Sequence, residues 1–192
     1  MAKRDEKREL VLREAMRLFS HKGYFGTGIN EILVACQIPK GSFYYYFPEG
    51  KEQLAAEVLR YAYETMEQGI RAEIFSVSDG DAVAVFTKML DRLISLFSRE
   101  HIYQSLAITF MGLESVYISD GVSQAAREVY ECWQGLYREK LLSCGYAPAD
   151  AERHSLTLFT LVHGALISCW LKQDTGDMRR MKDELPHILG KT

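Results

Sequence analysis

The 192-residue sequence contains few residues that interrupt helices and few that could cross-link a chain. Its four prolines are scattered, and no stretch shows the apolar and polar alternation of a half-buried strand. Its four cysteines lack the short spacings of zinc sites, and the N-terminus does not resemble a signal peptide. These features argue against a disulfide-stabilised secreted domain. We expect a cytoplasmic protein with free thiols, no metal site and no cofactor.

Charged residues are missing from one stretch, Ser155 to Leu171, which is apolar enough to raise the question of a membrane span. It has only 17 residues, whereas a transmembrane helix needs about 20, and it carries five hydroxyl or imidazole side chains. We therefore expect a helix that is buried in the core of a protein without a membrane partner.

Apolar residues recur at helical spacing along the chain, and turn residues separate the resulting segments. The sequence predicts helices over Asp5–Lys22, Ile29–Cys36, a short segment from Pro39, Lys51–Phe75, Asp81–Arg99, Tyr103–Glu114, Val122–Ser143, Ala149–Lys172 and Asp177–Leu189. Pro186 is expected to bend the last helix or end it early. The predicted fold class is therefore all-α, with about nine helices.

Charge is unevenly distributed along the chain. Residues 1–54 hold nine Lys and Arg against seven Asp and Glu, whereas the remainder is acidic and brings the net charge to -3. A basic N-terminal part on an acidic body suggests that only this part meets a polyanion.

The N-terminal part contains the stretch GYFGTGINEILVACQIPKGSFYYYF, which has a helix start at Thr27, a short helix, a break at Gln37 and a second short helix. Two short helices braced by a preceding one are typical of a helix-turn-helix DNA reader.

The second short helix contains three consecutive tyrosines, in the run PKGSFYYYF. Phe43 and Phe47 lie four residues apart and share one helix face, which we expect to pack on Val34, Ala35 and the first helix. Three consecutive side chains cannot share that face, so the tyrosines point away from it. A tyrosine hydroxyl can donate to a DNA phosphate, Lys40 adds positive charge, and Gly41 lets the backbone approach the groove. An aromatic cluster within the core is the other interpretation.

From about Asp5 to Leu54 the chain resembles the tetracycline-repressor (TetR) family of bacterial transcriptional regulators. The shared pattern is F-x-x-x-G-[YF], a threonine, I-x-x-A and K-G-[ST]-[LF]-Y-x-[HY]-F, in this order. The resemblance implies a homodimer with an N-terminal three-helix helix-turn-helix domain over residues 1–50 and a larger helical domain over 51–192. The first domain would bind a double-stranded DNA operator. The second would bind a small effector and form the dimer.

The resemblance also assigns roles to single residues. Thr27 is expected to cap the second helix and contact phosphate, and Lys51 to contact phosphate from the start of the fourth helix. The expected contacts of the recognition helix are Lys40, Gly41, Ser42, Tyr44, Tyr45 and Tyr46. Two positions depart from the family pattern: Lys51 follows Phe47 by four residues instead of three, and Gln37 stands in the turn where glycine is frequent.

Adaptable Met and aromatic side chains recur in the larger helical region, although each taken singly is more often a core residue. The resemblance makes them candidates for the lining of a pocket for a small hydrophobic or aromatic effector. The predicted lining residues are Met66, Phe86, Met89, Phe110, Met111, Tyr117, Tyr130, Trp133, Tyr137 and His163. The apolar stretch is expected to contact the second copy of the chain, with Gly164, Leu166 and Trp170 in the dimer interface.

Two other classes remain open from the residues alone. One is a helical dimeric interaction protein that does not bind DNA. The other is a helical-bundle enzyme, but a di-iron site of that kind needs two Glu-x-x-His motifs, and the chain has one, Glu184–His187. We expect instead a ligand-responsive regulator, not an enzyme. It would be a repressor that binds a palindromic operator as a dimer and is released by its effector.

Overall fold

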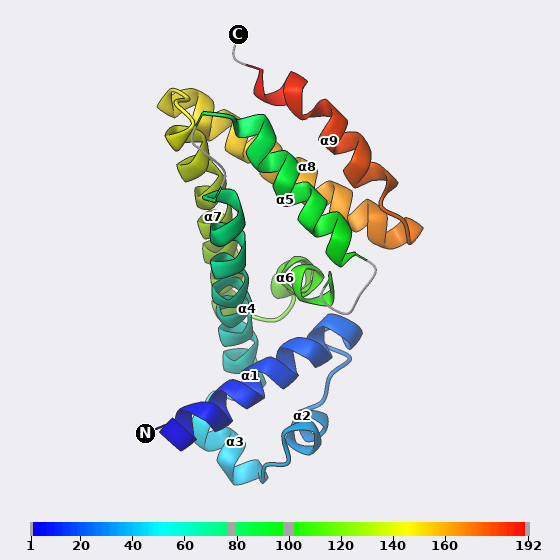
Figure 1. Cartoon of the computed structure of the whole chain (residues 1–192). Coiled ribbons are helices and arrows are strands. Elements are labelled where there is room, and N and C mark those ends of the chain that lie inside the picture. The colour runs from blue at the N-terminus through cyan, green and yellow to red at the C-terminus, as the bar shows by residue number, and fades with distance from the viewer. Residues whose placement is uncertain (1, 77–79, 98–101, 191–192) are drawn as a thin grey trace. The chain divides into compact units, whose positions relative to one another are not determined.

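The computed structural model describes residues 2–76, 80–97 and 102–190. Over these residues the chain forms helices and no strand (Figure 1). The helices are α1 (Ala2–Lys22), α2 (Ile29–Cys36), α3 (Lys40–Tyr46), α4 (Lys51–Ile74), α5 (Ala82–Leu96), α6 (Ile102–Ser115), α7 (Asp120–Ser143), α8 (Pro148–Lys172) and α9 (Gly176–Leu189). The predicted all-α fold with about nine helices is confirmed.

The predicted helix ends agree with the structure to within a few residues, with one correction at α9. This helix continues through Pro186 to Leu189 instead of ending early. Its residues Met178, Met181, Leu185 and Leu189 are buried at helical spacing, so apolar burial on both sides of the proline holds the last turn. The predicted end of α5 at Arg99 lies outside the described residues.

The described helices form two compact units. The first unit contains Met1–Thr65 and Tyr103–Tyr130, and the second contains Met66–Ile102 and Glu131–Thr192. The long helices α4 and α7 therefore contribute to both units. The division into domains over 1–50 and 51–192 stays a prediction.

The core of the first unit forms around α1. Its residues Val11, Ala15 and Phe19 are at most 1% exposed, in agreement with the apolar stripe of the sequence. From the two short helices, Ile32 and Phe43 join this core without any exposed surface. Each such side chain contributes roughly 1.5–3 kcal/mol through burial.

The second unit contains α8, whose inward side is buried along its whole length. Helix α9 packs against both α5 and α8, as Figure 1 shows. By length and composition α8 could also cross a membrane, with 44% of its most apolar window buried, but core helices pass the same test. Its role in the core of this unit explains the apolar residues on its buried side.

The four cysteines have free thiols, as predicted. Cys36, Cys144 and Cys169 are buried, whereas Cys132 is exposed on α7. Burial raises the pKa of Cys36 to about 11, so this thiol is protonated at neutral pH. Cys36 therefore acts as a small apolar core residue.

Candidate DNA-binding surface

The turn between α2 and α3 is tight although it lacks glycine. Gln37 has the left-handed conformation, with φ 52° and ψ 43°. Its N–H donates to the Val34 carbonyl at 3.2 Å, and the Ile38 N–H donates to the Leu33 carbonyl at 3.1 Å. These bonds satisfy the last carbonyls of α2 and reverse the chain within two residues. The helix-turn-helix predicted from the sequence is therefore formed, with strain at Gln37.

We expect Gln37→Gly to stabilise the protein by up to about 1 kcal/mol. Glycine removes the left-handed penalty of ~1–2 kcal/mol, and this gain exceeds the about 0.5–1 kcal/mol that the greater backbone entropy of the unfolded chain costs. The melting temperature should rise by about 2–4 °C. Calorimetry checks this. The control is Gln68→Gly at an exposed position within α4, which should lower the melting temperature. A Gln37→Gly protein that melts below the wild type would contradict the assigned strain.

Two buried phenylalanines anchor helix α3 in the core of the first unit. Phe43 and Phe47 have no exposed surface, and their ring centroids lie 5.5 Å apart. The guanidinium of Arg8 lies 5.5 Å from the centroid of the Phe47 ring and forms an ion pair with Glu57 of α4. The inward face of α3 is confirmed.

Of the two predicted partners on α2, Val34 is wrong, whereas Ala35 is half-buried. Val34 is 76% exposed, whereas Ile32 and Cys36 are buried. Ile32 and Cys36 lie four residues apart on one side of α2, and Val34 falls midway between them on the opposite side. The inward side of α2 is therefore the side that carries Ile32 and Cys36.

The other side of α3 is open to solvent. Tyr45 is 62% exposed and Tyr44 is 39% exposed, whereas Tyr46 and Ser42 are half-buried. Gly41 is exposed, and a Cβ added there would meet nothing within 4 Å. The exposed Lys40 places its ammonium 5.9 Å from the Tyr44 ring centroid. The core interpretation of the tyrosine run is therefore excluded for Tyr44 and Tyr45.

Thr27 does not cap α2, which corrects the expectation from the family pattern. The N-cap residue is Gly28, and no side chain caps this helix. The Thr27 hydroxyl donates instead to the Gly23 carbonyl at 2.9 Å, and the residue is 1% exposed. The Thr27 N–H donates to the Tyr24 carbonyl and closes a turn, which directs the Thr27 side chain back toward the end of α1. A phosphate contact of Thr27 stays a prediction.

Lys51 opens α4, as predicted, but its half-buried side chain is directed toward Tyr24 of the same unit. Its ammonium donates to the Tyr24 carbonyl at 2.5 Å and lies 3.9 Å from the centroid of the Tyr24 ring. Burial lowers the pKa of Lys51, and the nearby Glu114 carboxylate opposes this shift. The predicted phosphate contact of Lys51 stays a prediction.

Four of the predicted effector residues form an aromatic cluster in the second unit. Phe86 lies 5.3 Å from Tyr137, and Trp133 lies 5.1 Å from His163, between ring centroids. Phe159, which sequence reasoning missed, lies 4.1 Å from His163 and 6.4 Å from both Trp133 and Tyr137. Burial lowers the pKa of His163 and raises that of Tyr137. The cluster is an apolar core that favours a neutral imidazole.

The remaining predicted effector residues do not join this cluster. Met89 is buried and Met66 is half-buried, both in the second unit. Phe110, Met111, Tyr117 and Tyr130 belong to the first unit. Tyr117 is 79% exposed in the turn after α6, so its predicted place in the interior is wrong. The helix ends at Ser115, and the turn directs Tyr117 outward.

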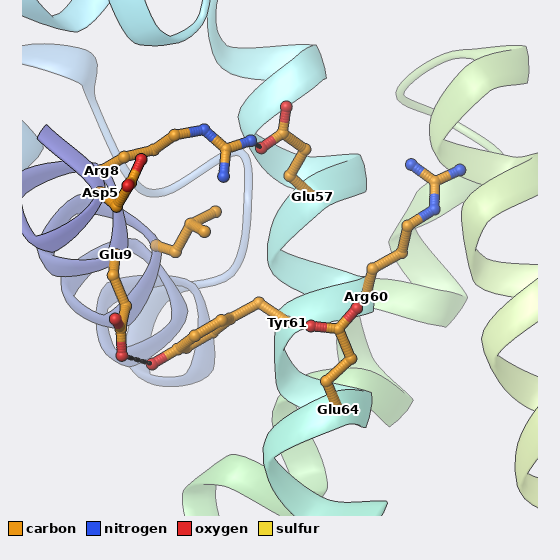
Figure 2. Close-up of a pocket in the computed structure, with 8 residues that line it drawn as sticks. Asp5, Arg8, Glu9, Glu57, Arg60, Tyr61 and Glu64 are labelled. Carbon is orange, nitrogen blue, oxygen red and sulfur yellow. Dashed lines mark hydrogen bonds and ion pairs between the residues drawn. The ribbon is translucent and has the colours of Figure 1, made fainter. Parts of the chain in front are cut away.

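A polar pocket of about 400 Å³ lies within the first unit, between α1 and α4. It is lined by Asp5, Arg8, Glu9, Leu12, Glu57, Arg60, Tyr61 and Glu64. Figure 2 shows the Tyr61 hydroxyl directed toward the Glu9 carboxylate, at 3.5 Å, and Arg8 directed toward Glu57. None of these residues was predicted to bind an effector. Because six of the eight are charged, this pocket does not suit a hydrophobic compound.

The predicted dimer residues divide between the two sides of α8. Leu166 is 1% exposed and faces the core of its own chain, so its place in a dimer interface is wrong. Gly164 is exposed and Trp170 is half-buried. The large apolar residues on the outward side are Leu156, Leu161 and Leu171, with exposed fractions of 54%, 41% and 76%. Helical spacing could have separated the two sides, since Leu166 follows the buried Phe159 and Val162 by seven and four residues.

Two family profiles match the chain. Residues 11–58 match the profile of bacterial regulatory proteins of the tetR family. Residues 82–184 match the C-terminal domain of LmrA/YxaF-like transcriptional regulators. The chain is 30% identical to the HTH-type transcriptional regulator LmrA of Bacillus subtilis over 185 residues, which cover 96% of the chain and 97% of LmrA. It is 27% identical over 192 residues to the uncharacterized HTH-type transcriptional regulator YxaF of the same organism, covering 100% and 99%.

Solved structures share the fold. A TetR transcriptional regulator from Chloroflexus aurantiacus has a TM-score of 0.83 and 25% identity, with 100% of this chain and 98% of that chain covered. The reduced form of NemR from E. coli has a TM-score of 0.82 at 19% identity, covering 95% and 97%. Because the matching profiles and the curated relatives are transcriptional regulators, the interpretations as an enzyme and as an interaction protein without DNA binding are excluded. The chain belongs to the TetR family of bacterial transcriptional regulators and is a ligand-responsive DNA-binding protein.

Proposed function

We propose that the protein is a cytoplasmic repressor that binds a palindromic operator as a homodimer and releases it when a small hydrophobic or aromatic effector binds. The observation that carries this proposal is the two-sided α3, with Phe43 and Phe47 fully buried and Tyr44 and Tyr45 exposed. Residues 1–50 then form the DNA-binding domain, and residues 51–192 form the effector-binding and dimerisation domain.

The proposed DNA-facing residues are those on the open sides of α3: Lys40, Gly41, Ser42, Tyr44, Tyr45 and Tyr46. Lys40 supplies positive charge, and the tyrosine hydroxyls donate to phosphate oxygens. Without a Cβ at Gly41, the backbone of α3 approaches the major groove closely. Two copies related by two-fold symmetry would read half-sites about 34–36 Å apart.

The outward side of α8 supports a homodimer. From Ser155 to Leu171 the helix has no charged residue, although Leu156, Leu161 and Leu171 are exposed. Exposed apolar surface on this scale is typical of an interface. Gly164 lies among these leucines and lets a second helix approach closely. We propose that α8 contacts α8 of the second copy.

The aromatic cluster of the second unit is the proposed location of the effector. Phe86, Trp133, Tyr137, Phe159 and His163 offer apolar rings and few polar groups, which suits an apolar or aromatic compound. Such a compound would have to enlarge the space between these rings. It would release DNA only if it binds the form with low DNA affinity more tightly.

The experiment that tests the function is fluorescence anisotropy with labelled DNA from upstream of the protein's own coding region. The wild-type protein should bind this DNA with higher affinity than random DNA, and more weakly at higher salt. Equal affinity for both DNAs at every salt concentration would contradict a specific operator. In the same assay, hydrophobic compounds that raise the melting temperature should release the operator, whereas nucleotides and sugars should not.

We expect Tyr44→Phe to fold normally and to lower operator affinity about fivefold, because it keeps the ring and removes one neutral hydrogen bond. Anisotropy and thermal melting on the same sample measure both effects. Tyr117→Phe is the control, since Tyr117 is an exposed tyrosine outside the DNA-facing surface. If Tyr44→Phe, Tyr45→Phe and Tyr46→Phe each bind like the wild type, the hydroxyls are not phosphate ligands.

A further inference from the structure

The junction between α1 and α2 is formed by Gly23 and Tyr24. Gly23 ends α1 with φ +72°, and its N–H donates to the Phe19 carbonyl at 2.9 Å. Tyr24 is 8% exposed, and its ring packs beside Phe19 with 5.7 Å between ring centroids. The direction in which the chain leaves this junction sets the start of α2 and, through the tight turn, the position of α3.

Two elements outside the three N-terminal helices hold this junction. The Tyr24 N–H donates to the carboxylate of Glu114, on α6, at 2.8 Å. The Tyr24 carbonyl accepts from Lys51, the first residue of α4, at 2.5 Å. Both main-chain polar groups of the buried Tyr24 are therefore bound by charged side chains from distant parts of the sequence, all within the first unit.

The contact with Glu114 depends on a glycine. A Cβ at Gly23 would lie 2.7 Å from the Glu114 carboxylate oxygen, which is closer than such atoms approach in proteins. The Glu114 carboxylate can therefore reach the Tyr24 amide because Gly23 has no side chain in its path. The Lys51 ammonium, held on the Tyr24 carbonyl and ring, is partly desolvated, and the Glu114 charge compensates part of that cost.

We propose that Glu114 is a positioning residue for DNA binding, which fixes the α1–α2 junction from α6, and that Lys51 holds the same junction instead of binding phosphate. The proposal rests on DNA binding by α3. It gives α6 a direct link to the DNA-binding helices through the main chain of Tyr24. A change in α6 that withdraws Glu114 would free the Tyr24 amide and loosen the start of α2.

The first experiment compares Glu114→Ala with Glu114→Gln. The alanine variant loses the acceptor, so amide exchange at Tyr24 should accelerate and operator affinity of the folded protein should fall about tenfold. The glutamine variant keeps an acceptor oxygen, so it should restore most of both properties. Glu128→Ala is the control, because it removes a carboxylate of the same unit that pairs with Arg60 at 3.0 Å on the surface.

A change in stability alone would not alter the affinity of the folded protein, so active concentration is measured by titration with excess DNA. Recovery in Glu114→Gln supports the hydrogen bond to Tyr24. Wild-type affinity in Glu114→Ala overturns the proposal, and so does a Glu114→Gln protein that is as weak as Glu114→Ala.

The second experiment compares the salt dependence of Lys51→Met and Lys40→Met. A lost phosphate contact lowers the slope of log affinity against log salt by about one unit, which we expect for Lys40→Met. Lys51→Met should weaken binding without changing the slope. An equal fall in slope for Lys51→Met would overturn its internal role. If Lys40→Met changes neither affinity nor slope, the proposed DNA-facing surface fails, while amide exchange at Tyr24 still decides the role of Glu114.

Discussion

Phe47→Ala is expected to lower the free energy of unfolding by about 3–5 kcal/mol, the largest effect on stability among the substitutions considered for the DNA-binding helices. The Phe47 side chain has no exposed surface and packs on Phe43. The guanidinium of Arg8 covers its ring and ties α1 to Glu57 of α4. Truncation therefore leaves a cavity below α3 and removes a support of the Arg8 ion pair. Operator binding should be lost along with the packing of α3.

Urea denaturation and anisotropy measure the two effects of Phe47→Ala. The control is Tyr45→Ala, two residues away on the same chain segment, where the side chain is 62% exposed. That variant should change stability by no more than about 0.5 kcal/mol and still weaken DNA binding. A Phe47→Ala protein with wild-type stability would show that α3 does not rest on this ring.

Leu161→Glu is expected to convert the protein into a folded monomer. Leu161 is 41% exposed on the uncharged outward side of α8, so a carboxylate there costs little within one chain. In a dimer formed through α8, two such carboxylates would be desolvated close to each other. Because a monomer reads only one half-site, operator affinity should fall on the order of 100-fold or more.

Sedimentation velocity gives the mass of Leu161→Glu, and circular dichroism confirms its helical content. Leu142→Glu is a matched control, because Leu142 is a leucine of α7 with nearly the same exposure, 43%. It should remain dimeric and bind the operator. If both variants stay dimeric, the interface lies elsewhere than on α8.

The helices could be predicted from the sequence because each long one repeats apolar residues at helical spacing. Val11, Ala15 and Phe19 form one such stripe, and all three are buried. The continuation of α9 beyond Pro186 could not be predicted from local propensity, since it depends on packing of Leu185 and Leu189 in the tertiary structure. Local rules describe a helix in isolation, whereas burial decides its ends.

The candidate site was predictable in part. The exposed tyrosines of α3 follow from helix geometry, because consecutive residues cannot share the side of Phe43 and Phe47. The position of Lys51 did not follow, since its contact with Tyr24 depends on how α4 begins beside the α1–α2 junction. Thr27 was misassigned because a threonine before a helix can bind the preceding backbone as well as the following one.

The effector residues were the least predictable part, because a pocket wall and a core have the same chemistry. Trp133 and Tyr137 are 3% and 1% exposed, as expected for either role. Tyr117 has a similar side chain but lies in a turn, where it is exposed. Composition therefore indicates an apolar interior without showing which residues a ligand would touch.

The uncharged outward side of α8 has a consequence for how the regulator responds to its own abundance. With dimerisation through this surface, the amount of DNA-binding species follows the square of the monomer concentration when most of the protein is dissociated, and the melting temperature rises with concentration. A cell that halves the copy number of such a regulator loses more than half of its operator occupancy at low occupancy. Gene dosage would then set the threshold for derepression even without effector.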